Sequence, residues 1–289
     1  FRERGSSFIT DMDRCPVLHP AVGQNLRPLA EFIETLSIRD RIPQIELAIG
    51  DDGVILIFRL LEPLLPEETD RLVAFCDRYH WVPYGQEAGP DSVRPLAEPL
   101  QLFYTLHEEK LRFDFLPNDF TQVNSAINRK MIDQAMAWLR PSGEESILDL
   151  FCGIGNFTLP LARRARHVTG IEGDAALVRR ARENMEKNGI GNVSYHVANL
   201  YESIEHARWT RQHYDAVLLD PPRSGAFEMM PLIAATGASR VLYVSCYPGT
   251  LARDAAELVN HHGYRLIRAG VMDMFPHTAH VESMALFEK

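Results

Sequence analysis

The sequence predicts an α/β fold in which helices cover both faces of a parallel sheet, preceded by a small α+β subdomain. Two observations lead to this prediction. In residues 118–289, short segments rich in Val, Ile and Leu alternate with segments whose apolar residues recur every three or four positions, as expected for successive βαβ units. In residues 1–117 the same two kinds of segment follow one another without regular alternation. We therefore expect two domains, 1–117 and 118–289.

The first domain is expected to contain two helices and at least four strands. The helices are expected over 28–37 and 66–80, and the strands over 42–50, 54–60 and, as a pair, within 101–117. The turn Asp51-Asp52-Gly53 joins the first two strands, because Asp and Gly tolerate the positive φ angles of tight turns. Pro66 and the acidic residues after it are typical of the first turn of a helix.

The second domain is expected to alternate between strands and helices along its whole length. Helices are expected over 125–140, 156–165 and 174–189, with another after Pro248, and strands over 146–151, 168–173, 193–200, 214–220, 240–246 and 264–273, with one or two more near the C-terminus. In such a sheet the ligand binds beyond the carboxyl ends of the strands. The residues that follow each strand are therefore the candidates for function.

The composition of the 289-residue chain, with 46% hydrophobic and 24% charged residues, is that of an ordinary globular protein. No apolar run has the length that a membrane-spanning helix needs, and residues 1–14 lack the apolar stretch of a secretory signal peptide. The cysteines at 15, 76, 152 and 246 form no C-x-x-C pair, so neither a disulfide framework nor a zinc site is indicated. We expect a cytoplasmic protein with no membrane association and no obligate protein partner.

The net charge of −9 at pH 7 argues against a free-standing nucleic-acid-binding domain, because such domains usually carry a basic surface. Any contact with RNA must then depend on local patches. Two groups of arginines are visible, at 163, 164 and 166 and at 179, 180 and 182. Both are better explained as solvated helix faces.

The strongest local motif, DLFCGIGNF at 149–157, lies between a predicted strand and a predicted helix. Gly153 and Gly155 permit a tight turn and a close approach to a ligand, although a turn without a ligand is an alternative. Glu172 ends the next strand, where an acid can hold the hydroxyls of a ribose. NAD and S-adenosylmethionine both contain a ribose. A dinucleotide site would have a third glycine where Thr158 stands, so the motif favours S-adenosylmethionine.

Two further strand ends carry residues suited to chemistry. The prolines of Asp220-Pro-Pro-Arg223 form either a rigid wall for a flat base or simply a rigid loop. Cys246 ends a strand just before Pro248, and a nearby helix N-terminus favours the thiolate that a nucleophile needs. The alternative is a buried structural cysteine, which is our interpretation of Cys152 inside the glycine turn.

Residues 273–282 concentrate two histidines and two acids. The spacing of His277, His280 and Glu282 matches no zinc-binding pattern, so we expect no metal ion there. The more specific functional interpretation is that the carboxylate of Glu282 acts as a general base. A structural or solvent-facing glutamate is the alternative.

Five motifs occur in a fixed order from Phe120 to the C-terminus: FTQVN, DLFCGIGNFTLPLA, DPPRSG, VSCYPGTLARD and FPHTAHVE. Together they resemble the bacterial RNA (uracil-5-)-methyltransferases, specifically the branch that acts on 23S rRNA. The resemblance implies a Rossmann-like class I methyltransferase domain that transfers a methyl group from S-adenosylmethionine to C5 of a uridine in 23S rRNA. It implies cofactor contacts from Gln122, Phe151, Asn156, Glu172, Asn199 and Asp220, with Cys246 as nucleophile and Glu282 as base.

The resemblance is weaker in residues 1–117, where CPVL at Cys15 is similar to the segment that supplies the fourth ligand of the family's [4Fe–4S] cluster. The other three cysteines and the RNA-binding TRAM domain would lie upstream of Phe1. We therefore expect a catalytic core that binds S-adenosylmethionine without a cluster and docks RNA weakly. Tyr247 stands where the family usually has Asn, which affects only the contacts of that side chain.

Other functions remain open. The chain could methylate a uridine of tRNA or of another rRNA site, although Cys15 favours the cluster-bearing ribosomal branch. It could be a noncatalytic RNA-binding or ribosome-assembly module, which would have no need for Cys246 and Glu282 at one cleft. An NAD-dependent oxidoreductase is disfavoured by Thr158. Tyr104, Tyr247 and Phe227 are candidate stacking surfaces for a flipped base.

Overall fold

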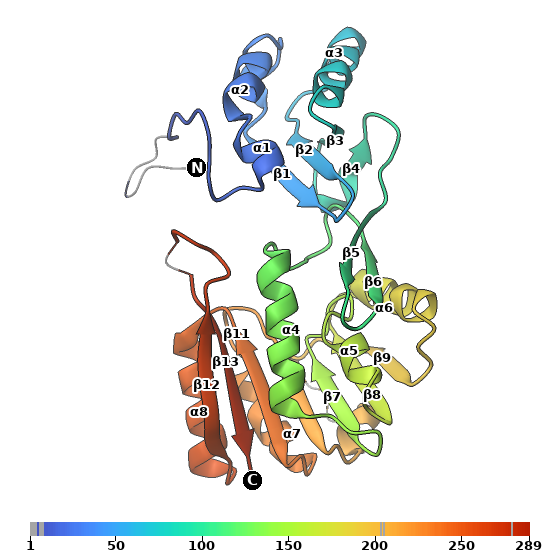
Figure 1. Ribbon diagram of the computed structural model, residues 1–289, viewed down its shortest axis with the longest axis vertical. Coiled ribbons are helices and arrows are strands. Elements are labelled where there is room, and N and C mark those ends of the chain that lie inside the picture. The colour runs from blue at the N-terminus through green and yellow to red at the C-terminus, as the bar shows by residue number, and fades with distance from the viewer. Residues whose placement is uncertain (1–4, 6–8, 203, 205, 279) are drawn as a thin grey trace. The chain divides into compact units, whose positions relative to one another are not determined.

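The computed structural model describes residues 5, 9–202, 204, 206–278 and 280–289, and Figure 1 shows the arrangement of its elements. The chain forms two compact units. The first comprises residues 1–103 and 116–118, and the second comprises residues 104–115 and 119–289. The segment 104–115 therefore belongs to the second unit, although it precedes the end of the first in sequence.

The first unit is built on a four-stranded sheet with the order β1-β2-β3-β4. Its elements are α1 (Pro20–Gly23), α2 (Leu26–Glu34), β1 (Gln44–Ile49), β2 (Val54–Arg59), α3 (Pro66–Asp77), β3 (Trp81–Gln86) and β4 (Val93–Pro95). The predicted hairpin is confirmed, since β1 and β2 are antiparallel with Ile49 opposite Val54. The sequence did not predict β3, because Pro83 and Gly85 interrupt it and both residues are disfavoured in strands.

The second unit is built on a seven-stranded sheet with the order β12-β13-β11-β10-β7-β8-β9. Its strands are β7 (Ser146–Leu150), β8 (His167–Glu172), β9 (Val193–Val197), β10 (Ala216–Leu219), β11 (Arg240–Ser245), β12 (Arg265–Met272) and β13 (Glu282–Glu288). Its helices are α4 (Ser125–Leu139), α5 (Thr158–Ala162), α6 (Ala175–Lys187), α7 (Met230–Ala235) and α8 (Pro248–His261). A separate hairpin consists of β5 (Leu102–Leu106) and β6 (Leu111–Phe115). Figure 1 shows α4 in front of the seven-stranded sheet and α7 and α8 behind it, which confirms the predicted α/β class.

Local sequence explains why the central elements begin where they do. The side chain of Asn124 accepts a hydrogen bond from the N–H of Ile127, 3.1 Å away, and caps α4. Asp174 caps α6 in the same way through Ala176 N–H at 2.6 Å. These bonds satisfy N–H groups that a helix start would otherwise leave unpaired. The apolar residues of β7 are fully buried, as expected for a parallel strand covered on both faces.

The order of the strands places a switch point between β7 and β10. The chain passes from β7 through β8 to β9 at one edge of the sheet, then returns so that β10 pairs with the other side of β7. The connection that follows β7 therefore runs toward one edge of the sheet, and the connection that follows β10 runs toward the other edge. A crevice forms beyond the carboxyl ends of such strands, which here are followed by residues 151–157 and 220–226.

The expected parallel sheet becomes mixed at its C-terminal end. β13 is antiparallel to both β11 and β12. The described residues between β12 and β13, 273–278 and 280–281, form no helix, and the chain returns in the opposite direction without a helical crossover. The last strand consequently lies between β12 and β11 and begins, rather than ends, at the functional edge of the sheet. Among the described residues, no helix is long and apolar enough to cross a membrane.

Candidate functional site

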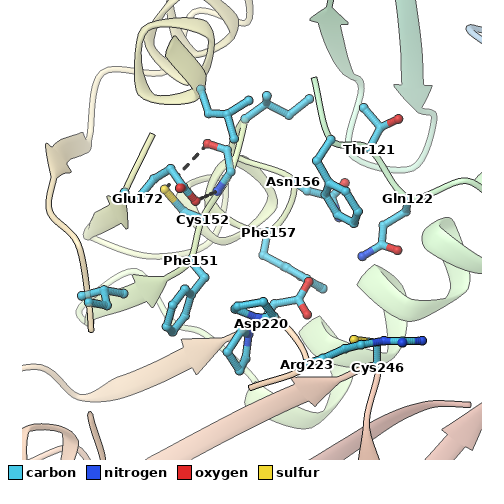
Figure 2. A pocket seen from close by; sticks show the side chains of 18 of the residues that line it. Thr121, Gln122, Phe151, Cys152, Asn156, Phe157, Glu172, Asp220, Arg223 and Cys246 are labelled. Atoms are coloured by element: carbon cyan, nitrogen blue, oxygen red, sulfur yellow. Dashed lines mark hydrogen bonds between the residues drawn. The ribbon is translucent and has the colours of Figure 1, made fainter. Parts of the chain in front are cut away.

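A cavity of about 690 Å³ opens at the carboxyl ends of the central strands (Figure 2). Its volume lies in the range of small-molecule sites. Of the residues predicted for the site, those that line it are Gln122, Phe151, Gly153, Asn156, Glu172, Asn199, Asp220, Cys246 and Glu282. All lining residues belong to the second unit. Gly155 and Cys15 are not among them.

The two glycines of the turn after β7 have different roles. The N–H of Gly153 donates to Glu172 Oε2 at 3.1 Å, and a Cβ built at this position meets no atom within 4 Å. Gly155 has φ +95°, and a Cβ there would lie 2.7 Å from the hydroxyl of Tyr195. Gly155 is therefore required by packing against Tyr195, whereas Gly153 borders the cavity.

Glu172 is held by backbone groups at the end of β8. Its Oε2 accepts from Gly153, and its Oε1 accepts from the N–H of Asp174 at 3.0 Å. Each carboxylate oxygen can accept a second hydrogen bond. The side chain is thus fixed while retaining acceptors for the hydroxyl groups of a ligand.

The side chain of Asn156 is engaged in an internal network. Its Nδ2 donates to Asn128 Oδ1 at 2.9 Å, and its Oδ1 accepts from Asn128 Nδ2 at 3.1 Å and from the hydroxyl of Tyr104 at 2.8 Å. Tyr104 also lines the cavity and stacks on Phe113, with ring centroids 4.9 Å apart. Asn156 therefore ties α4 and the β5–β6 hairpin to the glycine turn. Sequence reasoning missed Asn128, because no motif links it to a position 28 residues away.

Other lining residues form the walls of the cavity. Asn199 donates to Glu202 Oε1 at 2.8 Å and accepts from the N–H of Tyr201 at 3.1 Å. Tyr201 contacts the ring of Phe151, with centroids 5.8 Å apart. Figure 2 shows the side chain of Gln122 directed into the cavity. Sequence reasoning did not assign Tyr201, which belongs to no recognised motif.

Cys246 and Glu282 are brought together by the antiparallel pairing of β11 and β13. Ser245 lies opposite Ser283, and the hydroxyl of Ser283 donates to the carbonyl of Ser245 at 3.0 Å. Cys246 and Glu282 are the next residues beside this last pair, and both line the cavity. A thiol and a carboxyl group therefore share one end of the cavity.

The carboxyl groups around the cavity are unusually weak acids. Burial raises the pKa of Glu282 to about 7. Burial, with the charges of Glu282 and Asp149, raises the pKa of Asp220 to about 8. Asp149, behind the glycine turn, has its pKa raised to about 7 by burial, although Thr158 donates to it at 2.5 Å. A cation bound beside these groups would favour their ionised forms, whereas an anion would oppose them, so the site suits a cationic ligand better than an anionic one.

The expectation that the helix N-terminus would favour the thiolate of Cys246 is not supported. Burial raises the pKa of this thiol, and the carboxylates of Glu282 and Asp220 raise it further. The guanidinium of Arg223 acts in the opposite direction. Among the charged side chains that act on the thiol, Arg223 is therefore the one that favours the thiolate.

The raised pKa of Asp220 predicts how stability depends on pH. Because this pKa is raised from 3.8 to about 8 in the folded protein, the carboxyl group's contribution to stability is lost as pH rises through this interval. Asp220→Asn removes the titration and is expected to increase the free energy of unfolding at pH 8.5 by about 1–3 kcal/mol. At pH 4 the two proteins should be similar. Urea unfolding at both pH values measures the free energy of unfolding of the two proteins. Asp70→Asn, a change at an exposed residue, is the control. A wild-type protein more stable than Asp220→Asn at pH 8.5 would contradict the prediction.

Tyr247 occupies the N-cap of α8 and makes no side-chain capping bond. Its φ of −141° and ψ of 98° are extended, a conformation that a capping residue adopts readily. Tyr247→Asn supplies a side-chain acceptor at the start of the first turn, and we expect it to stabilise the protein by about 1 kcal/mol. Thermal unfolding measures the change. Tyr247→Ala is the control without an acceptor, and equal melting temperatures for the two variants would rule out a capping effect.

The remaining candidates lie elsewhere. Cys15 is buried in the first unit, where its N–H donates to the carbonyl of Gly23 at 2.7 Å. In the part of the chain that the structure describes, no three His, Cys, Asp or Glu residues are grouped so as to hold a metal ion. A [4Fe–4S] cluster takes four cysteine ligands, so the described residues do not fit one. Phe227 lies under the guanidinium of Arg253, at 5.3 Å, and does not line the cavity.

Of the C-terminal histidines, His280 lines the cavity with Phe275, whereas His277 does not. Arg223 is hydrogen-bonded to the ring of His280. The intervening motif includes Ala279, which lies outside the described residues. The prolines of the loop after β10, Pro221 and Pro222, also line the cavity, as a rigid wall would.

Comparisons with known proteins agree with this geometry. The family described as tRNA (Uracil-5-)-methyltransferase matches residues 98–289. A curated protein of Methylococcus capsulatus, 23S rRNA (uracil(1939)-C(5))-methyltransferase RlmD, is 54% identical over 100% of this chain and 66% of its own length. The protein of the same name from Alkalilimnicola ehrlichii is 53% identical over 100% of this chain and 65% of its own length. The chain thus spans just under two thirds of these relatives.

Solved structures are also similar. The crystal structure of Pyrococcus abyssi tRNA (uracil-54, C5)-methyltransferase in complex with S-adenosyl-L-homocysteine matches with a TM-score of 0.76 and 26% identity, over 99% of this chain and 72% of that one. That of TYW2 from M. jannaschii in complex with AdoMet has a TM-score of 0.54 at 17% identity, over 84% of this chain and 100% of that one, and shows the fold alone. With a match over most of its length, and with five motifs set around one cavity, this chain belongs to the tRNA (uracil-5-)-methyltransferase family.

Proposed function

We propose that the chain methylates C5 of a uridine in 23S rRNA, using S-adenosylmethionine and a covalent intermediate on Cys246. The observation that carries this proposal is the placement of a thiol and a carboxyl group at one end of a cavity whose other end carries the glycine turn and Glu172. A noncatalytic RNA-binding module would have no use for such a pair.

The cavity fits S-adenosylmethionine better than a dinucleotide. The N–H of Gly153, which would bind a phosphate in a dinucleotide site, is already donated to Glu172. Carboxyl groups surround the cavity, which favours a sulfonium cation and disfavours a pyrophosphate. Glu172 would accept from the ribose hydroxyls, Phe151 and Tyr201 would contact the adenine, and Asp220 would face the charged end of the molecule. When bound, S-adenosylmethionine supplies the methyl group that is transferred to C5.

Cys246 and Glu282 act before and after the transfer. C5 of uracil is a weak nucleophile, so the thiolate of Cys246 first adds to C6 and turns C5 into an enolate-like carbon. After methylation, C5 carries both the new methyl group and its original proton. Glu282 removes that proton, the electron pair restores the C5–C6 double bond, and the thiolate of Cys246 leaves. A base inside structured RNA must first be turned out into the cavity.

The relatives named above support 23S rRNA as the substrate, since proteins called 23S rRNA methyltransferases are 53–54% identical to this chain, whereas the tRNA enzyme of known structure is 26% identical. Methylation of tRNA is the second candidate, favoured by the TM-score of 0.76 with that enzyme. The surfaces that dock phosphates decide between the two substrates.

The proposal is tested with RNA fragments in which the target uridine is 5-fluorouridine. Fluorine leaves no proton at C5 for Glu282 to remove, so a protein that completes the transfer stays bound to the RNA. We expect a band on a denaturing gel that depends on S-adenosylmethionine and forms with a 23S rRNA fragment but not with a tRNA fragment. An adduct with tRNA alone would favour the second candidate. If neither RNA forms an adduct while calorimetry detects bound S-adenosylmethionine, the proposed methylation of uracil is wrong.

A further inference from the structure

Asp254 is a fully buried carboxylate on α8, the helix that follows Cys246. Its Oδ2 accepts from the N–H of Ala226 at 2.7 Å and from the hydroxyl of Tyr243 at 2.6 Å. Its Oδ1 accepts from the guanidinium of Arg253 at 2.7 Å. A buried charge is tolerated only where such partners compensate for the lost hydration. Asp254 thus joins three segments: α8, β11 and the loop after β10.

Two neighbouring bonds strengthen the same junction. The hydroxyl of Thr250 donates to the carbonyl of Arg223 at 3.2 Å, and Arg253 Nη2 donates to the carbonyl of Ser224 at 3.0 Å. The loop after β10 is therefore bound, residue by residue, to the first turns of α8. This loop carries Arg223, and α8 follows Cys246 directly.

Gly225 shows how closely the loop approaches Asp254. It has φ +76°, and a Cβ built there would lie 2.7 Å from Asp254 Oδ2 and 2.9 Å from the Cβ of Thr250. Any larger residue would have to move the loop away from the helix. The close contact makes the position of the loop dependent on the carboxylate behind it.

We propose that Asp254 is a positioning residue that holds Arg223 at a fixed place relative to the Cys246 thiol. It touches neither the cavity nor the substrate, and it acts through the backbone of residues 223–226. The groups that face the thiol electrostatically are Glu282 and Asp220, which oppose its ionisation, and Arg223, which favours it. His280 lies at the same cavity and is hydrogen-bonded to Arg223. If the loop moves, the single favourable charge among them moves with it.

The test measures how readily Cys246 ionises. The inference rests on the proposed role of Cys246. Alkylation by iodoacetamide requires neither RNA nor S-adenosylmethionine, so the role of Asp254 and the proposed methylation of uridine are tested separately. The other three cysteines are buried, and mass spectrometry of the Cys246 peptide follows this thiol alone. The rate is recorded against pH, because only the thiolate reacts, and its midpoint is compared between variants.

We expect Asp254→Leu, which removes every hydrogen bond of the carboxylate, to raise the midpoint by about half a pH unit or more. Asp254→Asn should restore it to within about 0.2 unit, because one amide oxygen can still accept from Ala226 and Tyr243. Glu257→Leu, a matched change on α8 at a residue paired with His262, should leave it unchanged. An unaltered midpoint in folded Asp254→Leu would overturn the proposal.

Asp254→Leu removes a buried network and could prevent folding, which thermal unfolding would reveal. Gly225→Ala then provides the second variant, since its Cβ would clash with Asp254, Arg253 and Thr250 and displace the loop from α8. The same upward shift of the midpoint is expected. If Gly225→Ala leaves the midpoint at the wild-type value, the proposed link between the loop and the thiol is wrong.

Discussion

Cys246→Ala is expected to lower methylation of a 23S rRNA fragment by at least about 1000-fold, because uracil C5 is not nucleophilic enough without addition at C6. The 5-fluorouridine adduct should disappear completely. Binding of S-adenosylmethionine, measured by calorimetry, should change little, because the glycine turn and Glu172 remain in place. Transfer of labelled methyl groups measures the rate.

The control for this variant is Cys76→Ala, which removes a buried thiol from the first unit. It should still form the adduct. Cys246→Ala that methylates at more than a tenth of the wild-type rate would show that the reaction does not pass through this thiol. Loss of the adduct in both variants would instead indicate a general effect on folding, which a thermal unfolding measurement identifies.

Glu282→Gln is expected to lower turnover by about 10²–10⁴-fold through loss of the base. Unlike Cys246→Ala, it should block the reaction after the covalent intermediate has formed. Addition and methylation can still occur, whereas the C5 proton cannot be removed. A covalent complex with ordinary uridine RNA should therefore accumulate on a denaturing gel, and the wild-type protein should show none. The pH profile provides a second measurement: because the pKa of Glu282 is about 7, the wild-type rate should rise as pH increases through 7, and the variant should lack this rise.

Glu288→Gln is the matched control, since Glu288 lies at the other end of β13 and pairs with Arg140. Its turnover and pH profile should equal those of the wild type. A Glu282→Gln variant that turns over without accumulating a complex would assign proton removal to another group. Asp220 is the first alternative, because its raised pKa and its place in the cavity give it similar properties.

Much of this protein was determined by local sequence. The βα alternation after residue 118, the turn at Asp51-Gly53 and the glycine turn after β7 were predicted, because each depends on residues close in the chain. The family was identified from motifs whose spacing within each strand–turn–helix unit is fixed by the same local geometry. The strand ends could be named as the functional edge for that reason.

Tertiary structure alone decided how those ends meet. The sequence could not place β13 between β11 and β12, a pairing that brings Glu282 and Cys246 to the same cavity, because register depends on contacts between distant segments. Nor could it predict that Asn156 would be held by Tyr104 and Asn128. Nor could it predict that the pKa of the Cys246 thiol is raised, because that shift comes from burial and from the carboxylates of Glu282 and Asp220, which are distant in sequence. Local motifs specify which groups are present, whereas desolvation and long-range pairing specify their geometry and their acidity.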